Sequence, residues 1–431
     1  MDTVTIYSVV AGGILVTLTL IRVICSLKSR INIISMLILK HLAYPCLIKC
    51  HRLFGPWTRA NVLLYIVYGV VTIFSIAFRV PSASEAARRA GTLSLVNMGV
   101  TFIATHLSFL ADGLGCRVVD IPFIVFPPVL SPTCFLIFLY RNRVLSSQPS
   151  PRALVTCEKD DPSDKDAQVE GKPIKIHVTL PRPLEVKAGQ YVNLWMPSVG
   201  LGLASWMQTH PFMVTSWSPG KQDVLELFVQ TRRGLTAKLQ ARAAVDGSAS
   251  FSVFVSGPHG LSEPVSQYET VLAIVSGFGI AGVLSYLKQL LHGYNTSTSS
   301  IRRVHLVWQV ETLDIAIAAQ PLLNSLLVDD VLDNGYILEM SFYMESSTKV
   351  EDEKPFGKHK RAMLYHNQPN YGEIISSEVS GDYIPRLPNI HEERGRLLVM
   401  ASDELRDHLQ EIVRSYLHEK VGMCEVEFQP G

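Results

Sequence analysis

The sequence shows no excess of one charge and no closely paired cysteines. Its 431 residues hold 39 Lys and Arg against 38 Asp and Glu, a formal net charge of +1. Proteins that bind nucleic acid through its phosphates carry a basic surface, so this balance gives no indication of a nucleic-acid partner. The seven cysteines are scattered and form no C-x-x-C pair, which argues against a zinc site and against a disulfide framework. We therefore expect free thiols and no metal site.

Charged residues are scarce in the N-terminal third, where long apolar runs dominate. Residues 4–27 contain a single charge, Arg22, and are long enough to cross a bilayer. The runs 60–80 and 92–112 predict two further spans. Residues 121–140 contain four prolines, each of which removes a backbone donor, so this segment is interpreted either as a fourth span or as a re-entrant or interfacial one.

The loop between the first two predicted spans is basic. Residues 28–59 contain six Lys or Arg and no acidic residue. The positive-inside rule places such a loop on the cytosolic side of a membrane. We therefore expect an integral membrane protein.

Short alternating strands follow the apolar third. The runs IKIHVTL, YVNLWMP, FMVTS and VLELFVQ are separated by turn residues and predict an antiparallel barrel. The strand in FMVTS is expected to begin directly after Pro211, because proline cannot donate a ladder hydrogen bond. Thr236 is expected to cap a helix over 236–242, and Gly234 would let an anion approach the N-terminus of that helix. A capped helix without a ligand is the alternative.

The last third predicts an α/β domain. The near-continuous apolar run VLAIVSG is typical of a parallel central strand, and it leads through GFGIAG, residues 277–282, into an amphipathic helix. Strand, glycine turn and helix is the context in which glycines bind a dinucleotide. Further strands are expected at 302–310, 336–345 and 396–402. Arg302 or Arg303 is either a ligand of a 2′-phosphate or a solvated charge, and Trp308 is expected to pack in the core.

These motifs occur in a recognisable order. The segments AGQYVNLWMP, HPFMVTS, RRGLT, VSGPHG and VSGFGIAG resemble the flavin and nicotinamide modules of the ferredoxin-reductase superfamily. Within it, the chain resembles the fungal ferric and cupric reductases, relatives of the NADPH oxidases. The resemblance implies a multi-domain fold. N-terminal transmembrane helices in 1–143 would precede an antiparallel β-barrel that binds FAD in 144–265 and an α/β parallel-sheet nucleotide-binding domain in 266–431.

The resemblance also implies a function. A plasma-membrane flavoprotein with cytosolic C-terminal domains would pass electrons from NADPH through FAD to a metal ion such as ferric or cupric ion, or to a small-molecule acceptor. NADH remains an alternative donor, and no catalytic side chain is identified. The cofactor-binding residues implied by the motifs are His210, Pro211, Phe212, Val214, Thr215 and Ser216, then Arg233, Gly234 and Thr236, then Gly257, Gly260, Gly277, Gly279 and Gly282.

The sequence departs from this family in two places. Relatives bind b-type haem through paired histidines on membrane helices, whereas the histidines before residue 150 are His41, His51 and His106, with no pair at that spacing. We therefore expect an incomplete haem pathway. Ala401 and Ser402 stand where many relatives have a Cys-Gly-Pro turn. A non-catalytic, truncated membrane protein whose cytosolic module binds a nucleotide or a partner is the alternative hypothesis.

Overall fold

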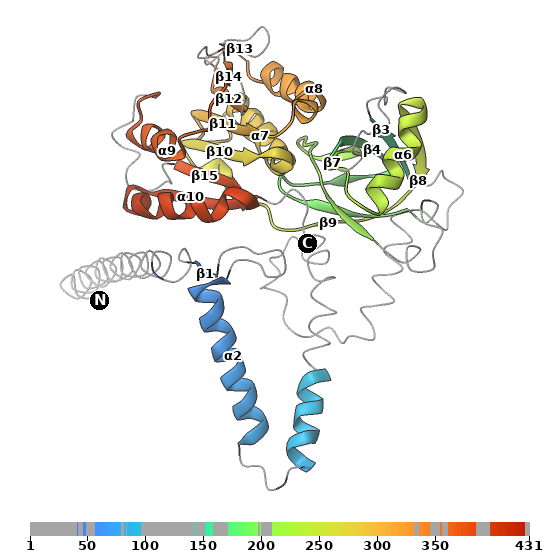
Figure 1. The fold of residues 1–431 in the computed structure, drawn as a ribbon, viewed down its shortest axis with the longest axis vertical. Coiled ribbons are helices and arrows are strands. Elements are labelled where there is room, and N and C mark those ends of the chain that lie inside the picture. Colours follow the sequence, from blue (N-terminus) through green and yellow to red (C-terminus); the bar gives the residue numbers. More distant parts are fainter. Residues whose placement is uncertain are drawn as a thin grey trace, which may run out of the picture.

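The computed structural model describes residues 57–78, 84–95, 151–157, 171–196, 209–331, 336–344, 361–384 and 397–426, with a few isolated positions besides. In these residues an N-terminal helical pair is followed by two domains packed side by side (Figure 1). The predicted spans 4–27 and 121–140, and most of 92–112, lie outside the described residues.

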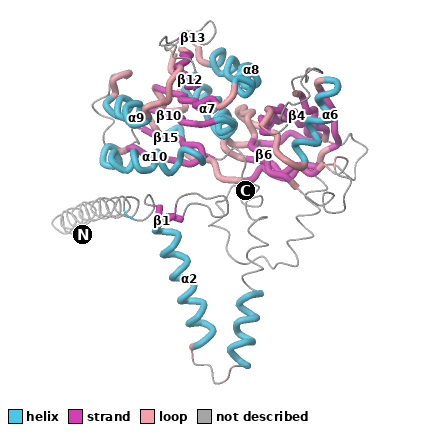
Figure 2. Tube along the Cα trace, in the orientation of Figure 1, coloured by secondary structure: helices cyan, strands magenta, loops and turns pink. Residues whose placement is uncertain are grey.

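Helix α2, Arg59–Ala77, occupies the predicted span 60–80. Its large apolar side chains are exposed, with Leu64 and Ile73 each 67% accessible. Residues 84–95 form a second helix, and Arg89 donates a 3.0 Å hydrogen bond to the carbonyl of Phe78 just after α2. The two helices stand away from the C-terminal domains (Figure 2). Across the residues described, no helix combines the length and the hydropathy that a membrane crossing needs.

The first C-terminal domain, called here the β domain, is built from two antiparallel sheets. Its strands are β3 Arg152–Thr156, β4 Pro173–Glu185, β5 Tyr191–Trp195, β6 His210–Met213, β7 Lys221–Gln230, β8 Ser248–Ser252 and β9 Phe254–His259. One sheet has the order β7-β4-β3-β8 and the other the order β6-β5-β9. The predicted barrel is thus two sheets in the described residues. A single core, which includes Ile176, Val192 and Leu225, joins their inner faces.

The predicted start of β6 is wrong. The strand begins at His210, and Pro211 lies inside it, opposite Asn193. β6 is an edge strand of its sheet, the position in which sheets tolerate proline. The strand ends at Met213, and the next residues turn toward β7, where the backbone N–H of Thr215 donates to the carbonyl of Glu226 (2.8 Å).

The second domain, the α/β domain, has a seven-stranded sheet of order β13-β14-β12-β11-β10-β15-β16. Its elements are β10 Thr270–Ser276, α7 Ile280–Asn295, β11 Arg303–Val310, α8 Leu313–Asp329, β12 Leu338–Met344, β13 Lys354–Pro355, β14 Ala362–Tyr365, α9 Tyr371–Ser380, β15 Leu397–Ser402, α10 Asp403–Tyr416 and β16 Val421–Val426. All pairings are parallel except β13 with β14. The predicted central strand is confirmed, because every residue of β10 is buried.

Helices cover both faces of this sheet (Figure 1). Val271, Ala273 and Val275 of β10 pack in the core that contains α7 and α8. Leu272 and Ile274, which alternate with them, pack in the core that contains α9 and α10. With both faces covered, a ligand can reach the sheet at the carboxyl ends of its strands, and this edge is where α/β sheets of this kind bind their ligands.

Helix α7 joins the two domains. The hydroxyl of Ser285 in α7 accepts a hydrogen bond from the backbone N–H of Gly189 in the β domain (3.1 Å). The rings of Phe228 in β7 and Phe278 lie 5.5 Å apart, and both belong to the core of the α/β domain. An apolar core shared across the boundary fixes the relative position of the two domains.

Candidate functional site

The glycine turn lies directly after the central strand. Gly277–Gly279 form a 3-10 turn that leads into α7. The indole N–H of Trp308, which is buried as predicted, donates to the carbonyl of Gly277 (2.9 Å). A Cβ at Gly279 would lie 2.6 Å from the Cβ of Ser402, so glycine is needed there. The first turn of α7 carries no acidic residue, which leaves its N-terminal N–H groups able to favour an anion.

Two carboxylates lie at this edge of the sheet. Glu404, in the first turn of α10, accepts a 2.5 Å hydrogen bond from the hydroxyl of Ser276. Glu311 follows the end of β11, and its Oε1 lies 2.5 Å from where a Cβ of Gly277 would stand. Burial raises the pKa of Glu311, and the charge of Glu404 raises this pKa further. In the described residues these carboxylates are not part of any group of three or more His, Cys, Asp or Glu able to hold a metal.

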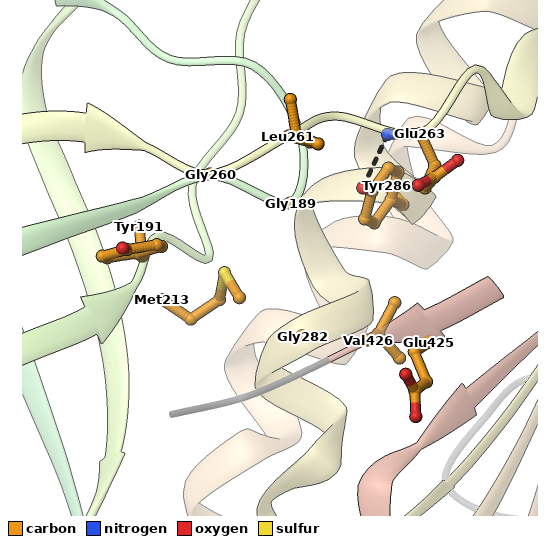
Figure 3. Close-up of a pocket in the computed structure, with 10 residues that line it drawn as sticks. All are labelled: Gly189, Tyr191, Met213, Gly260, Leu261, Glu263, Gly282, Tyr286, Glu425 and Val426. Atoms are coloured by element: carbon orange, nitrogen blue, oxygen red, sulfur yellow. Dashed lines mark hydrogen bonds between the residues drawn. The ribbon is translucent and has the colours of Figure 1, made fainter. Parts of the chain in front are cut away.

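A cavity of about 170 Å³ lies between the two domains. Figure 3 shows it between the strands of the β domain and helix α7. Its lining residues are Gly189, Tyr191, Met213, Gly260, Leu261, Glu263, Gly282, Tyr286, Glu425 and Val426. Sites that enclose a whole drug-sized ligand measure roughly 300–1,000 Å³, so this cavity suits one ring-sized group.

Tyr286 forms one wall of the cavity. Its hydroxyl oxygen accepts a 3.1 Å hydrogen bond from the backbone N–H of Glu263 (Figure 3). Burial raises the pKa of Tyr286 to about 12, so the phenol keeps its proton. Burial also raises the pKa of the nearby Cys424 to about 12, with the charges of Glu263 and Glu425 adding to the effect. The cavity therefore offers the neutral hydroxyl group of Tyr286 beside the carboxylates of Glu263 and Glu425, which also line it.

The turn before helix α6, Leu235–Asp246, also fits an anion. Gly234 precedes the helix with φ +93°, and an added Cβ would meet nothing within 4 Å. Arg233 beside it is exposed. The prediction that Thr236 caps the helix is wrong. Thr236 lies inside the first turn, and its hydroxyl is bonded to the backbone N–H and carbonyl of Arg232 (both 2.8 Å). The N-terminus has no side-chain cap, so its N–H groups can face a ligand.

The other predicted flavin-motif residues lie inside or at the edge of the β domain. Phe212 and Val214 are buried in its core, 2% and 1% accessible. The hydroxyl of Thr215 donates to the carbonyl of Glu226 (2.9 Å), while the hydroxyl oxygen of Ser216 accepts from the N–H of Glu226 (3.1 Å). His210 begins β6, and burial lowers its pKa.

Met213 is the residue of this motif that faces the cavity, and sequence reasoning missed it. It lies beside Tyr191 of the neighbouring strand (Figure 3). Consecutive side chains of a strand point to opposite faces, so Phe212 in the core places Met213 on the other face. This alternation was the available signal. Tyr286 and Glu425 had no comparable signal, because the fold of the α/β domain brings them to the cavity.

Besides Gly234, the predicted glycines lie in three places. Gly260 and Gly282 line the cavity, while Gly277 and Gly279 form the turn after β10. Gly257 lies within β9, where an added Cβ would stand 3.2 Å from the backbone oxygen of Tyr191.

Arg302 and Arg303 are strand-entry charges, as the second interpretation has it, but ion pairs hold both of them. The two residues lie at the amino end of β11, opposite the glycine turn. Arg302 forms a 2.7 Å ion pair with Glu269. Arg303 is buried and pairs with Glu378 (2.9 Å) and Glu339 (2.7 Å). Buried charges require such partners, so these arginines support the sheet.

Comparison with known proteins agrees with this architecture. Residues 165–263 match the FAD-binding domain family, and residues 268–412 match the ferric reductase NAD binding domain family. The chain thus carries an FAD-binding type of domain followed by a ferric reductase type of NAD binding domain. The C-terminal domain is therefore similar to the nicotinamide-nucleotide domain of ferric reductases.

Individual relatives are similar at modest identity. The chain is 31% identical over 150 residues to ferric/cupric reductase transmembrane component 2 of Saccharomyces cerevisiae, covering 34% of this chain and 20% of the relative. It is 25% identical over 148 residues to NADPH oxidase 1 of Mus musculus, covering 34% and 24%. The matched region thus spans between a fifth and a quarter of these relatives. The solved ferredoxin reductase in carbazole 1,9a-dioxygenase aligns with a TM-score of 0.39 and 11% identity, covering 65% of this chain and 69% of that one.

Proposed function

We propose that this chain is a flavin-dependent oxidoreductase that passes electrons from a reduced nicotinamide dinucleotide through FAD to a metal ion such as ferric or cupric ion. The observation that carries the proposal is the presence, in two adjoining domains, of two turns that fit an anion and of one cavity between the domains. The turn before α6 lies in the β domain, the glycine turn lies in the α/β domain, and the cavity lies between the domains.

The residues present fit FAD on the β domain. Gly234 leaves open space in front of the uncapped N-terminus of α6, and the exposed Arg233 adds a positive charge beside it. This arrangement would hold the pyrophosphate. Phe212, Val214 and the other predicted flavin residues belong to strand β6 and the turn after it, and Met213 of that strand reaches the cavity. FAD, when bound, supplies hydride acceptance and release of single electrons.

The chain's own residues would position the donor. The glycine turn and the first turn of α7 would bind the dinucleotide phosphates through backbone N–H groups. The cavity would hold one reacting ring, and Tyr286 and Met213, which line it, would exclude water from that ring. No side chain needs to transfer a proton for hydride transfer, so placement and electrostatics are the protein's contribution.

The acceptor and the membrane belong to the proposal as well. The relative from Saccharomyces cerevisiae is named a ferric/cupric reductase transmembrane component, which supports a metal-ion acceptor. Because the N-terminal third lacks paired histidines, we propose that the haem pathway is incomplete and that soluble acceptors are reduced on the nucleotide side. The apolar runs of the N-terminal third and the exposed apolar side chains of α2 support attachment to a membrane, the plasma membrane in our proposal, with cytosolic C-terminal domains.

A visible absorbance spectrum of the full chain, purified in mild detergent, tests the proposal. We expect flavin bands, no b-type haem band, and oxidation of reduced nicotinamide dinucleotide when ferricyanide is added. A colourless protein without this activity would support the alternative of a non-catalytic nucleotide- or partner-binding membrane protein. A b-type haem band would contradict only the proposed incomplete haem pathway and would leave the rest of the proposal unchanged.

A further inference from the structure

The carboxyl end of β11 places one acidic side chain in the nucleotide crevice. Glu311 is the first residue after β11, the strand next to β10 in the sheet. Its carboxylate lies against Gly277, with both oxygens within 3.0 Å of the position of an added Cβ. The side chain therefore stands beside the first glycine of the turn that would bind the dinucleotide.

This carboxylate is available to a ligand. Glu311 is exposed, and among the described residues its interactions include no hydrogen-bond donor and no cation. The neighbouring Glu404 differs, because its carboxylate is held by the hydroxyl of Ser276. Glu404 adds a second negative charge to the same edge of the sheet.

The chemistry of this position separates the two nicotinamide dinucleotides. In dinucleotide-binding folds a carboxylate at the end of the second strand accepts hydrogen bonds from the adenosine ribose, including its 2′-hydroxyl. A 2′-phosphate takes away that hydroxyl donor and brings about −1.5 to −2 of charge toward the carboxylate. Two like charges placed together in a binding site are strongly unfavourable.

The two arginines considered above as ligands of a 2′-phosphate do not lie near Glu311. Arg302 and Arg303 are at the amino end of β11, and both are engaged in ion pairs with Glu269, Glu339 and Glu378. A whole strand separates them from Glu311.

We propose that Glu311 makes this chain prefer NADH to NADPH. The inference rests on the proposed function, which leaves the choice of dinucleotide open. Glu311 acts as a specificity-determining residue through the adenosine ribose, remote from the atoms that exchange hydride.

Steady-state kinetics and ligand binding test this inference independently. With the full chain in detergent and ferricyanide as acceptor, we expect kcat/KM for NADH to exceed that for NADPH by about 30-fold or more. Glu311→Gln should reduce this ratio about 10-fold, because the amide removes the charge that repels a 2′-phosphate. Glu411→Gln, an exposed glutamate of α10, is the matched control and should leave the ratio unchanged.

Calorimetric titration with 5′-AMP and with 2′-phospho-AMP measures the same preference without turnover. The wild-type chain should bind 5′-AMP more tightly than 2′-phospho-AMP, and Glu311→Gln should narrow the difference between the two dissociation constants. Equal or tighter binding of 2′-phospho-AMP, or no binding of either, would overturn the inference. A chain that discriminates between the two probes but reduces no acceptor would retain the inference and refute the proposed oxidoreductase activity.

Discussion

Gly279 and Ser402 share a space that holds only one side-chain carbon. An added Cβ at Gly279 would stand 2.6 Å from the Cβ of Ser402, and the next neighbour, the Cβ of Val275, is at 3.6 Å. At the residue scale this contact decides how closely the glycine turn approaches β15. Glycine at this position is therefore required by a specific partner, Ser402.

Gly279→Ala should lower the free energy of unfolding by about 1–3 kcal/mol, because the overpacked turn must move. The double variant with Ser402→Gly should recover part of that loss, since it removes the clashing carbon. Gly372→Ala is the control, because its nearest neighbour lies at an ordinary 3.6 Å. Denaturant unfolding measures all three. A double variant no more stable than Gly279→Ala would show that another contact is responsible.

At the element scale, a buried polar network fixes helix α9 to the sheet. His305 in β11 contacts Glu378 of α9 through Nδ1 and Ser341 of β12 through Nε2, both at 2.9 Å. Arg303 places two nitrogens on the same carboxylate, Nε at 3.0 Å and a terminal nitrogen at 2.9 Å. Serine, histidine and glutamate in this order resemble a hydrolytic triad. Here all are buried within the domain, and their role is to satisfy one another.

Glu378→Gln should destabilise the chain by about 3 kcal/mol, because it leaves the buried Arg303 without its main counter-charge. Burial alone would raise the pKa of Glu378, but hydrogen bonds and charge from His305 and Arg303 lower that pKa overall. A lowered folded-state pKa contributes stability above the unfolded-state value of about 4.3, and this stability is lost as pH falls through the folded-state pKa. The free energies of unfolding of wild type and variant should therefore converge at acid pH. Denaturant unfolding measured at a series of pH values tests this. A difference independent of pH would contradict this account.

At the scale of the whole molecule, the contact between Gly189 and Tyr286 sets the distance between domains. Gly189 has φ +79°, and an added Cβ would lie 2.1 Å from the hydroxyl oxygen of Tyr286. The same glycine donates its N–H to Ser285, so the loop is held against α7 by a hydrogen bond and limited by the tyrosine ring. The cavity proposed to hold one reacting ring depends on this spacing.

Gly189→Ala should lower the melting temperature substantially more than Gly171→Ala. Both glycines have positive φ, 79° and 97°, so both variants suffer backbone strain of roughly 1–2 kcal/mol. At Gly189 the added Cβ would also clash with Tyr286, whereas nothing lies within 4 Å of an added Cβ at Gly171. Thermal unfolding by circular dichroism measures the difference. Equal decreases in melting temperature for the two variants would mean that the domains can move apart at this contact without loss of stability.

The local pattern of apolar residues and glycines in the sequence predicted much of the fold. The run VLAIVSG predicted the buried β10, and its glycine-rich continuation predicted the turn and α7, because both faces of a central parallel strand must be apolar. Strands β14 and β16 were missed. The four residues of β14 are only partly buried apart from Ala362, and β16 is buried only at its ends, so neither has a strong apolar period.

The sequence by itself determined the order of two nucleotide-binding modules, the glycine positions and the apolar strands, since these depend on periodicity and on chemistry between near neighbours in the chain. Tertiary structure alone decided that Arg303 is an internal ion-pair partner, that Met213 and Tyr286 line the same cavity from two domains, and that Glu311 lies over Gly277. The physical reason is that these residues lie far apart in the chain, 75 positions for Arg303 and Glu378, and only the packing of strands and helices brings them together.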